Sequence, residues 1–171
     1  MPLPGCKILA LIEPPTAIIK IVGRAAAESA RDFQHLIRRL QADGMTRFVL
    51  DLSGCLLMDS TFSGVLAGLA TEMGPTPGDD WQHFTIVGAN ARVLDLLDNL
   101  GVLPLVDVLE GGPSDKTLAE CQEIALGQHS KAEMTACCLE AHRLLMKLKP
   151  ENAAKFRTVT EILEQQLSAA A

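Results

Sequence analysis

Two adjacent hydroxyl side chains are the residues whose types and spacing best suit a chemical role in this sequence. Ser60 and Thr61 follow Asp59 directly, after an apolar run that ends at Met58. Asp, Ser and Thr are residue types that cap helix N-termini, so this triplet predicts the start of a helix. A hydroxyl in the first turn of a helix also donates and accepts hydrogen bonds locally, at a place where the backbone N–H groups and the helix dipole favour an anion. The simpler alternative is that the three residues cap the helix and do nothing else.

The sequence contains no pattern typical of an enzyme active site. It has no phosphate-binding glycine loop and no HExxH, and the segment around Ser63 lacks the first glycine of a nucleophile elbow. A zinc site made of His129 or His142 with Cys137 or Cys138 matches no common finger spacing. We therefore expect no catalytic residues, no cofactor and no metal, and the chain is not predicted to be an enzyme.

Composition and charge favour a protein partner over other ligands. The net charge is −6 and no basic cluster occurs, which disfavours nucleic acid and an anionic membrane surface. Aromatic residues make up 4%, with one Trp and no Tyr, too few for a base-stacking platform. The longest apolar segments, such as Phe62 to Ala70, fall short of the about 20 residues that a membrane span needs. With no recognisable signal peptide and five cysteines read as reduced thiols, we expect a soluble cytoplasmic protein.

The elements around the triplet predict an α/β domain. Two β-type runs, Lys7 to Ile12 and Ala17 to Val22, flank Pro14-Pro15 and predict an antiparallel hairpin. Strands and helices then alternate, which favours a mixed, mostly parallel sheet of four to five strands. The expected elements are a helix over 26–42, a strand over 47–52, an apolar run over 55–58, a helix from 59, a strand over 84–87, a helix over 90–100 and an edge strand over 105–109.

Gly64 and Gly68 lie one turn apart on the helix that the triplet begins. Glycines at this spacing leave a smooth patch on a helix, because neither residue has a Cβ. We expect the helix backbone to approach the sheet closely at this patch.

A C-terminal extension is predicted to be helical throughout. Gly111-Gly112-Pro113 marks the boundary between a first domain, residues 1–111, and an extension, residues 112–171. The expected helices cover Ser114 to Leu126, Lys131 to Lys149, and Pro150 to about Leu167. Their apolar stripes need a partner, which could be each other, the first domain, or a second copy of the chain in a homodimer.

The segment from Phe48 to Leu69 resembles the signature of the STAS domain, the fold of anti-sigma factor antagonists and of sulfate-transporter cytoplasmic tails. In that family a strand reading VLDLS leads to an apolar residue and then DSSGLGVL, in which the second hydroxyl is phosphorylated. Here the strand reads VLDLS over 49–53, the approach reads MDST over 58–61, and the helix continues GVL over 64–66. The resemblance covers about residues 7 to 110. It implies that Thr61 is the phosphate acceptor, with Ser60 as the second choice.

The resemblance also implies a function. A STAS-like chain of this kind is a non-enzymatic partner switch, similar to an anti-sigma factor antagonist, whose partner is an anti-sigma factor or a Ser/Thr-kinase-like protein. Partner contacts are expected beside the acceptor, at Asp59, Phe62, Ser63, Gly23 and Arg24. The sequence departs from the family at 62–63, where Phe-Ser replaces Gly-Leu, and at 23–26, where GRAA replaces GELD. The alternatives are a constitutive STAS subunit of a larger assembly, such as a lipid-transport complex, and a small-ligand sensor.

Overall fold

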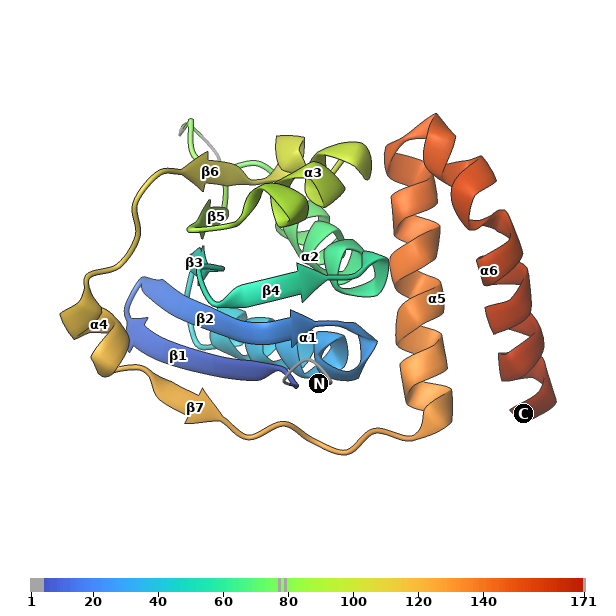
Figure 1. Cartoon of the computed structure of the whole chain (residues 1–171), viewed down its shortest axis with the longest axis horizontal. Coiled ribbons are helices and arrows are strands. Elements are labelled where there is room, and N and C mark those ends of the chain that lie inside the picture. Colours follow the sequence, from blue (N-terminus) through green and yellow to red (C-terminus); the bar gives the residue numbers. More distant parts are fainter. Residues whose placement is uncertain (1–4, 77, 79, 171) are drawn as a thin grey trace.

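A mixed sheet of seven strands forms the centre of the part of the chain that the computed structural model describes, residues 5–76, 78 and 80–170 (Figure 1). The N-terminal hairpin pairs β1 (Lys7–Glu13) with β2 (Thr16–Ala25) in antiparallel register, as the sequence predicts. Parallel strands β3 (Arg47–Asp51), β5 (Phe84–Val87) and β6 (Asp107–Leu109) extend the sheet from β2. The strand order is β6-β5-β3-β2-β1-β7, and β4 (Cys55–Met58) pairs separately with the end of β2. The α/β class with a mostly parallel sheet is confirmed, with more strands than the four to five expected.

Alternation along the strands creates the hydrophobic core. Ile19, Leu50 and Ile86 are fully buried on one face of β2, β3 and β5, whereas their neighbours Val49 and Thr85 are only half-buried. Helices α1 (Ala27–Ala42) and α2 (Ser60–Met73) lie behind the sheet in Figure 1 and supply the opposing side chains. This period-two pattern is what a sheet with one covered face requires.

Two stacked aromatic pairs join neighbouring elements, one between two helices and one between two strands. Phe33 of α1 stacks on Phe62 of α2 with ring centroids 4.8 Å apart, and Phe48 stacks on Phe84 across β3 and β5 at 5.2 Å. Stacked pairs of this kind contribute about 0.5–1.5 kcal/mol beyond the area they bury. The start of α2 is therefore anchored in the core through the ring of its third residue.

The segment after β6 corrects the prediction of a helix over 114–126. Helix α4 (Asp115–Ala119) begins as expected, with the Ser114 hydroxyl accepting from the Thr117 N–H, but it ends after five residues. The chain then forms β7 (Gln122–Ile124), which pairs antiparallel with Ile8–Ala10 of β1. The free edge of β1 offers backbone hydrogen bonds, and these override the local helical preference. The expected strand over 105–109 is also shorter, because a 3₁₀ turn, η1 (Leu103–Leu105), precedes β6.

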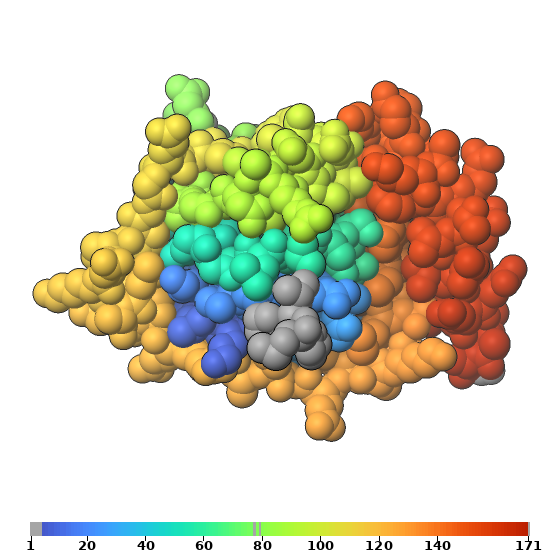
Figure 2. All heavy atoms as spheres, viewed as in Figure 1, coloured from blue at the N-terminus to red at the C-terminus, as the bar shows by residue number. Residues whose placement is uncertain are grey.

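The last two helices form a hairpin that packs on the sheet domain. They are α5 (Lys131–Leu148), which begins with a capping box of Ser130 and Glu133, and α6 (Pro150–Ala170), which begins at Pro150 as predicted. The buried Asn152 amide donates to the carbonyls of Leu100 and Leu145 at 2.9 and 2.8 Å, fixing the turn between them against the domain. In Figures 1 and 2 the hairpin lies along one end of the molecule.

One further helix, α3, follows β5. Helix α3 (Ala91–Asn99) is capped by the Asn90 side chain, whose oxygen accepts from the Val93 N–H. In the described residues, no helix is long and apolar enough to cross a membrane.

Candidate functional site

The start of α2 is fixed by one carboxylate. Asp59 is the N-cap residue, and its Oδ1 accepts from the Phe62 N–H at 2.8 Å. Its Oδ2 accepts from the N–H of Ala27 at 3.0 Å, the first residue of α1. The Asp59 N–H donates to the Ala25 carbonyl at 2.9 Å. Asp59 therefore holds the ends of β2 and β4 and the starts of two helices in one rigid junction.

Ser60 forms a hydrogen bond to a histidine of α5. The distance from its Oγ to Nε2 of His142 is 2.9 Å. The other ring nitrogen, Nδ1, lies 2.6 Å from the Cys138 carbonyl oxygen, which can only accept, so Nδ1 carries the proton. In the neutral imidazole Nε2 is then the acceptor and the Ser60 hydroxyl is the donor. His142 is buried, so water competes little for this bond.

Thr61 lies beneath α5. Its side chain is buried, with the residue 5% exposed, and its Oγ1 donates to Sγ of Cys138 at 3.5 Å. Burial raises the pKa of the Cys138 thiol above its usual value, so the hydroxyl faces a neutral group. The expected phosphate acceptor is thus covered by another part of the same chain.

Phe62 and Ser63, both expected to contact a partner, are buried in the domain. The Phe62 ring stacks on Phe33, and the Ser63 hydroxyl donates to the Asp59 carbonyl at 2.9 Å. Phe62 therefore faces α1, and both residues are fully buried. Neither side chain can reach a partner in this arrangement.

Gly23 and Arg24 lie beside the junction, at the end of β2 that pairs with β4. The pairing register shifts between these two residues, and Gly23 adopts a φ of 89°, a left-handed conformation that favours glycine. Arg24 is exposed, and its pairing partner on β4 is Leu57. The fold therefore brings Arg24 to the same edge as Asp59, although the two are far apart in sequence.

The glycine patch of α2 meets α5 and not the sheet, which corrects the expectation from the sequence. A Cβ placed on Gly64 would lie 2.6 Å from the carbonyl oxygen and 2.8 Å from the Cβ of Ala141. On Gly68 it would lie 3.3 Å from one methyl carbon of Leu144. The spacing of the glycines indicates a close helix contact, but nothing local in the sequence identifies α5 as the partner. His142 and Cys138, which bond the two hydroxyls, were missed for the same reason.

Metal-binding clusters of three or more His, Cys, Asp or Glu side chains are absent from the described residues. The five thiols are free, and burial raises the pKa of Cys55 and of Cys137 to about 11. Neither thiol is activated as a nucleophile, since activation requires a lowered pKa.

Comparisons with known proteins agree with the fold. A family model described as the STAS domain matches residues 7–121. The unphosphorylated form of the anti-sigma factor antagonist SpoIIAA superimposes with a TM-score of 0.53 at 13% identity, covering 67% of this chain and 93% of that one. The phosphorylated form of the Bacillus cell fate determinant SpoIIAA gives 0.50 at 12% identity, covering 67% and 96%. The NMR structure of the protein TM1081 gives 0.51 at 19% identity, covering 65% and 85%.

No curated protein sequence matches the chain. The family match ends before α5, so the α5–α6 hairpin lies outside it.

Proposed function

The chain belongs to the STAS domain family, and on this premise we propose that it is a non-catalytic cytoplasmic signalling module, a partner switch similar to an anti-sigma factor antagonist. Phosphorylation at the start of α2 controls the switch, with Thr61 as the acceptor and Ser60 as the second choice. The observation that carries the proposal is the Asp59-capped start of α2, which places two hydroxyls in its first turn.

The electrostatics of the helix start support an anion at this place. The unpaired N–H groups and the dipole of α2 favour negative charge, and a phosphate brings about −1.5 to −2. SpoIIAA has solved structures in both the unphosphorylated and the phosphorylated form, and both share the fold of this chain. A phosphate on Thr61 would lie beside the Asp59 carboxylate and in the space of the Cys138 thiol. Modification therefore changes the surface that a partner meets, by charge and by bulk.

The proposed partner is a protein such as an anti-sigma factor or a Ser/Thr-kinase-like protein. It would contact the edge formed by Arg24 and Asp59, where Arg24 is exposed beside the start of α2, whereas Gly23, also expected as a contact, is buried. The unphosphorylated chain is the active, binding form. Nucleic acid remains an unsuitable ligand for a chain of net charge −6 without a basic cluster.

Peptide mapping of the protein purified from its native host tests the proposal. We expect a phosphate on Thr61 or Ser60 in at least one growth condition. With the partner in hand, Thr61→Asp should weaken binding at least tenfold, whereas Thr61→Val, which keeps the shape of the side chain and adds no charge, should bind like the wild type. A chain that is unmodified in every condition, or a Thr61→Asp variant that binds normally, would contradict the proposal.

The burial of Thr61 favours a second candidate, a constitutive subunit of a larger assembly such as a lipid-transport complex. In this role the unmodified hydroxyl only serves the hydrogen bond to Cys138. Co-purification of the chain with membrane ATPase subunits, undiminished by Thr61→Val and without any phosphate, would favour this candidate over the switch.

A further inference from the structure

The first turns of α2 are covered by α5 through three successive contacts. Ser60 bonds to His142, Thr61 bonds to Cys138, and Gly64 lies against the backbone of Ala141. The two contacts nearest the helix start are polar, and the third brings two helix backbones together. A protein kinase cannot reach Thr61 while these contacts hold, because the residue is only 5% exposed.

The connection between the sheet domain and α5 can act as a hinge. Residues 125–130 form neither helix nor strand and are mostly exposed. One side chain fastens them to the domain: Oδ1 of Asp32 accepts from the Gly127 N–H at 2.9 Å and lies 3.0 Å from Nε2 of His129. Further attachments are the packing of α5, its bonds to Ser60 and Thr61, and the bonds of Lys149 and Asn152 at its far end.

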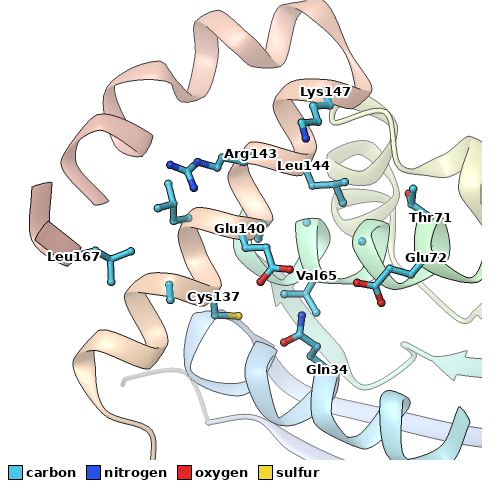
Figure 3. A pocket seen from close by; sticks show the side chains of 15 residues that line it. Gln34, Val65, Thr71, Glu72, Cys137, Glu140, Arg143, Leu144, Lys147 and Leu167 are labelled. Atoms are coloured by element: carbon cyan, nitrogen blue, oxygen red, sulfur yellow. The ribbon is translucent and has the colours of Figure 1, made fainter. Parts of the chain in front are cut away.

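A groove borders the contact between α5 and α2. A groove of about 490 Å³ runs along the contact, lined by α1, α2 and α5 and by Leu167 of α6 (Figure 3). Charged side chains line it beside apolar ones, among them Glu72, Glu140 and Lys147. Along this groove one side of the α2–α5 contact faces the surface and not a further layer of protein.

We propose that α5 is a displaceable lid on the acceptor face of α2, and that Thr61 becomes accessible only when the α5–α6 hairpin swings away on residues 125–130. The significance of the lid for signalling rests on the proposed function, whereas the opening itself does not. Phosphate on Thr61 would then hold the lid open, because the modified side chain no longer fits under Cys138.

Thiol labelling measures the opening directly at the acceptor position. In the full-length double variant Thr61→Cys with Cys138→Ser, hydroxyl and thiol exchange places, and the new thiol reports access to position 61. The probe is iodoacetamide under native conditions, with each labelled cysteine identified by peptide mapping. Cys55, in the sheet domain and 1% exposed, serves as the internal reference for global unfolding.

We expect the thiol at position 61 to be labelled at least tenfold faster than Cys55, and at least tenfold slower than the same thiol in urea. Adding Gly64→Ala should accelerate labelling at 61 about tenfold, because the new methyl meets the Ala141 backbone. Gly68→Ala is the matched control: it is the same change one turn along the same helix, where the neighbour is the flexible end of Leu144. It should leave the rate within about twofold.

Equal rates at position 61 and Cys55 would overturn the proposal, because α5 would then open only when the whole domain unfolds. A rate at 61 equal to that in urea would also overturn it, because α5 would not cover α2 in solution. If the double variant does not fold, Cys137 of the wild type supplies the same comparison, since it lies in the α2–α5 contact and is 4% exposed. None of these outcomes depends on whether Thr61 is phosphorylated. The experiment can therefore contradict the displacement of α5 without contradicting the proposed partner switch, and the reverse.

Discussion

The carboxylate of Asp59 accepts a hydrogen bond of 3.0 Å from the backbone N–H of Ala27, 32 residues earlier in the chain. The same carboxylate caps α2 through the Phe62 N–H, whereas Ala26, the N-cap residue of α1, provides no side-chain cap of its own. One acidic residue therefore caps the N-terminal ends of two helices. Asp59 has a structural role at this junction whether or not a phosphate is ever added beside it.

Replacing Asp59 should destabilise the fold in two distinguishable steps. Asp59→Ala removes both caps and should lower the free energy of unfolding by about 2–3 kcal/mol, since each lost cap costs about 0.5–2. Asp59→Asn keeps one acceptor for the Phe62 N–H and should lose about half as much. Urea unfolding monitored by circular dichroism measures both variants. No loss in Asp59→Asn would show that the bond to Ala27 contributes nothing, and equal losses for the two variants would show that the bond to Phe62 contributes nothing.

The Ser60–His142 pair should show energetic coupling. The free energies of unfolding of Ser60→Ala, His142→Ala and the double variant form a cycle, from which we expect a coupling of about 0.5–1.5 kcal/mol, the usual net value of one buried hydrogen bond. His142→Ala alone should cost more than Ser60→Ala, because the ring also packs edge-on against Phe156 with centroids 4.9 Å apart. Additive losses would mean that the 2.9 Å contact is not a stabilising hydrogen bond.

Local sequence patterns predict most of the sheet domain. The hairpin, the alternation of strands and helices, and the helix that begins after Asp59 are encoded by neighbouring residues: β-type runs, turn residues and a capping side chain. The helix expected over 114–126 is wrong beyond Ala119 because the free edge of β1, more than a hundred residues earlier, recruits Gln122–Ile124 as a strand. The secondary-structure propensity of a segment depends on neighbouring residues, so it does not predict pairing with a strand so far away in the sequence.

The same limit applies to the candidate site. The sequence identifies Asp59, Ser60 and Thr61 because their types and order alone predict a capped helix. It does not predict that Cys138 and His142 lie over them, since no local rule connects residues so far apart in sequence. Small residues at 64 and 68 predict a close contact, but only the fold shows that α5 makes it.

The buried thiols should make the protein less stable in alkali. Burial raises the pKa of Cys55 and of Cys137 from 9.0 to about 11, so both stay protonated in the folded state where the unfolded chain loses their protons. Their stabilising contribution is complete below pH 9 and is lost as the pH rises toward 11.

The urea midpoint of unfolding should fall across this pH window, and the double variant Cys55→Ala with Cys137→Ala should show a smaller fall. Because the chain has no Tyr, only thiols, lysines and the chain's α-amino group overlap with the measurement. An unchanged slope in the double variant would contradict the assignment.

A disulfide between α2 and α5 should lock the lid. In the single variant Thr61→Cys the new thiol lies next to Cys138, whose Sγ is 3.5 Å from Oγ1 of Thr61 in the native chain. Mild oxidation should join the two with only a small shift of the side chains, and the closed loop should raise the free energy of unfolding by about 2–4 kcal/mol. Oxidised protein should show iodoacetamide labelling of Cys137 slowed to the rate of Cys55, and a reductant should restore the faster rate.

Thr61→Ser, which cannot form the bond, is the control for the disulfide lock and should respond to neither oxidant nor reductant. Binding of a partner to the edge at Arg24 should be equal in the oxidised and the reduced Thr61→Cys variant, because the unphosphorylated chain with α5 in place is the proposed binding form. Loss of binding in the oxidised form, regained on reduction, would mean that the partner uses the α2 face that α5 covers, and would contradict the proposed contact at Arg24.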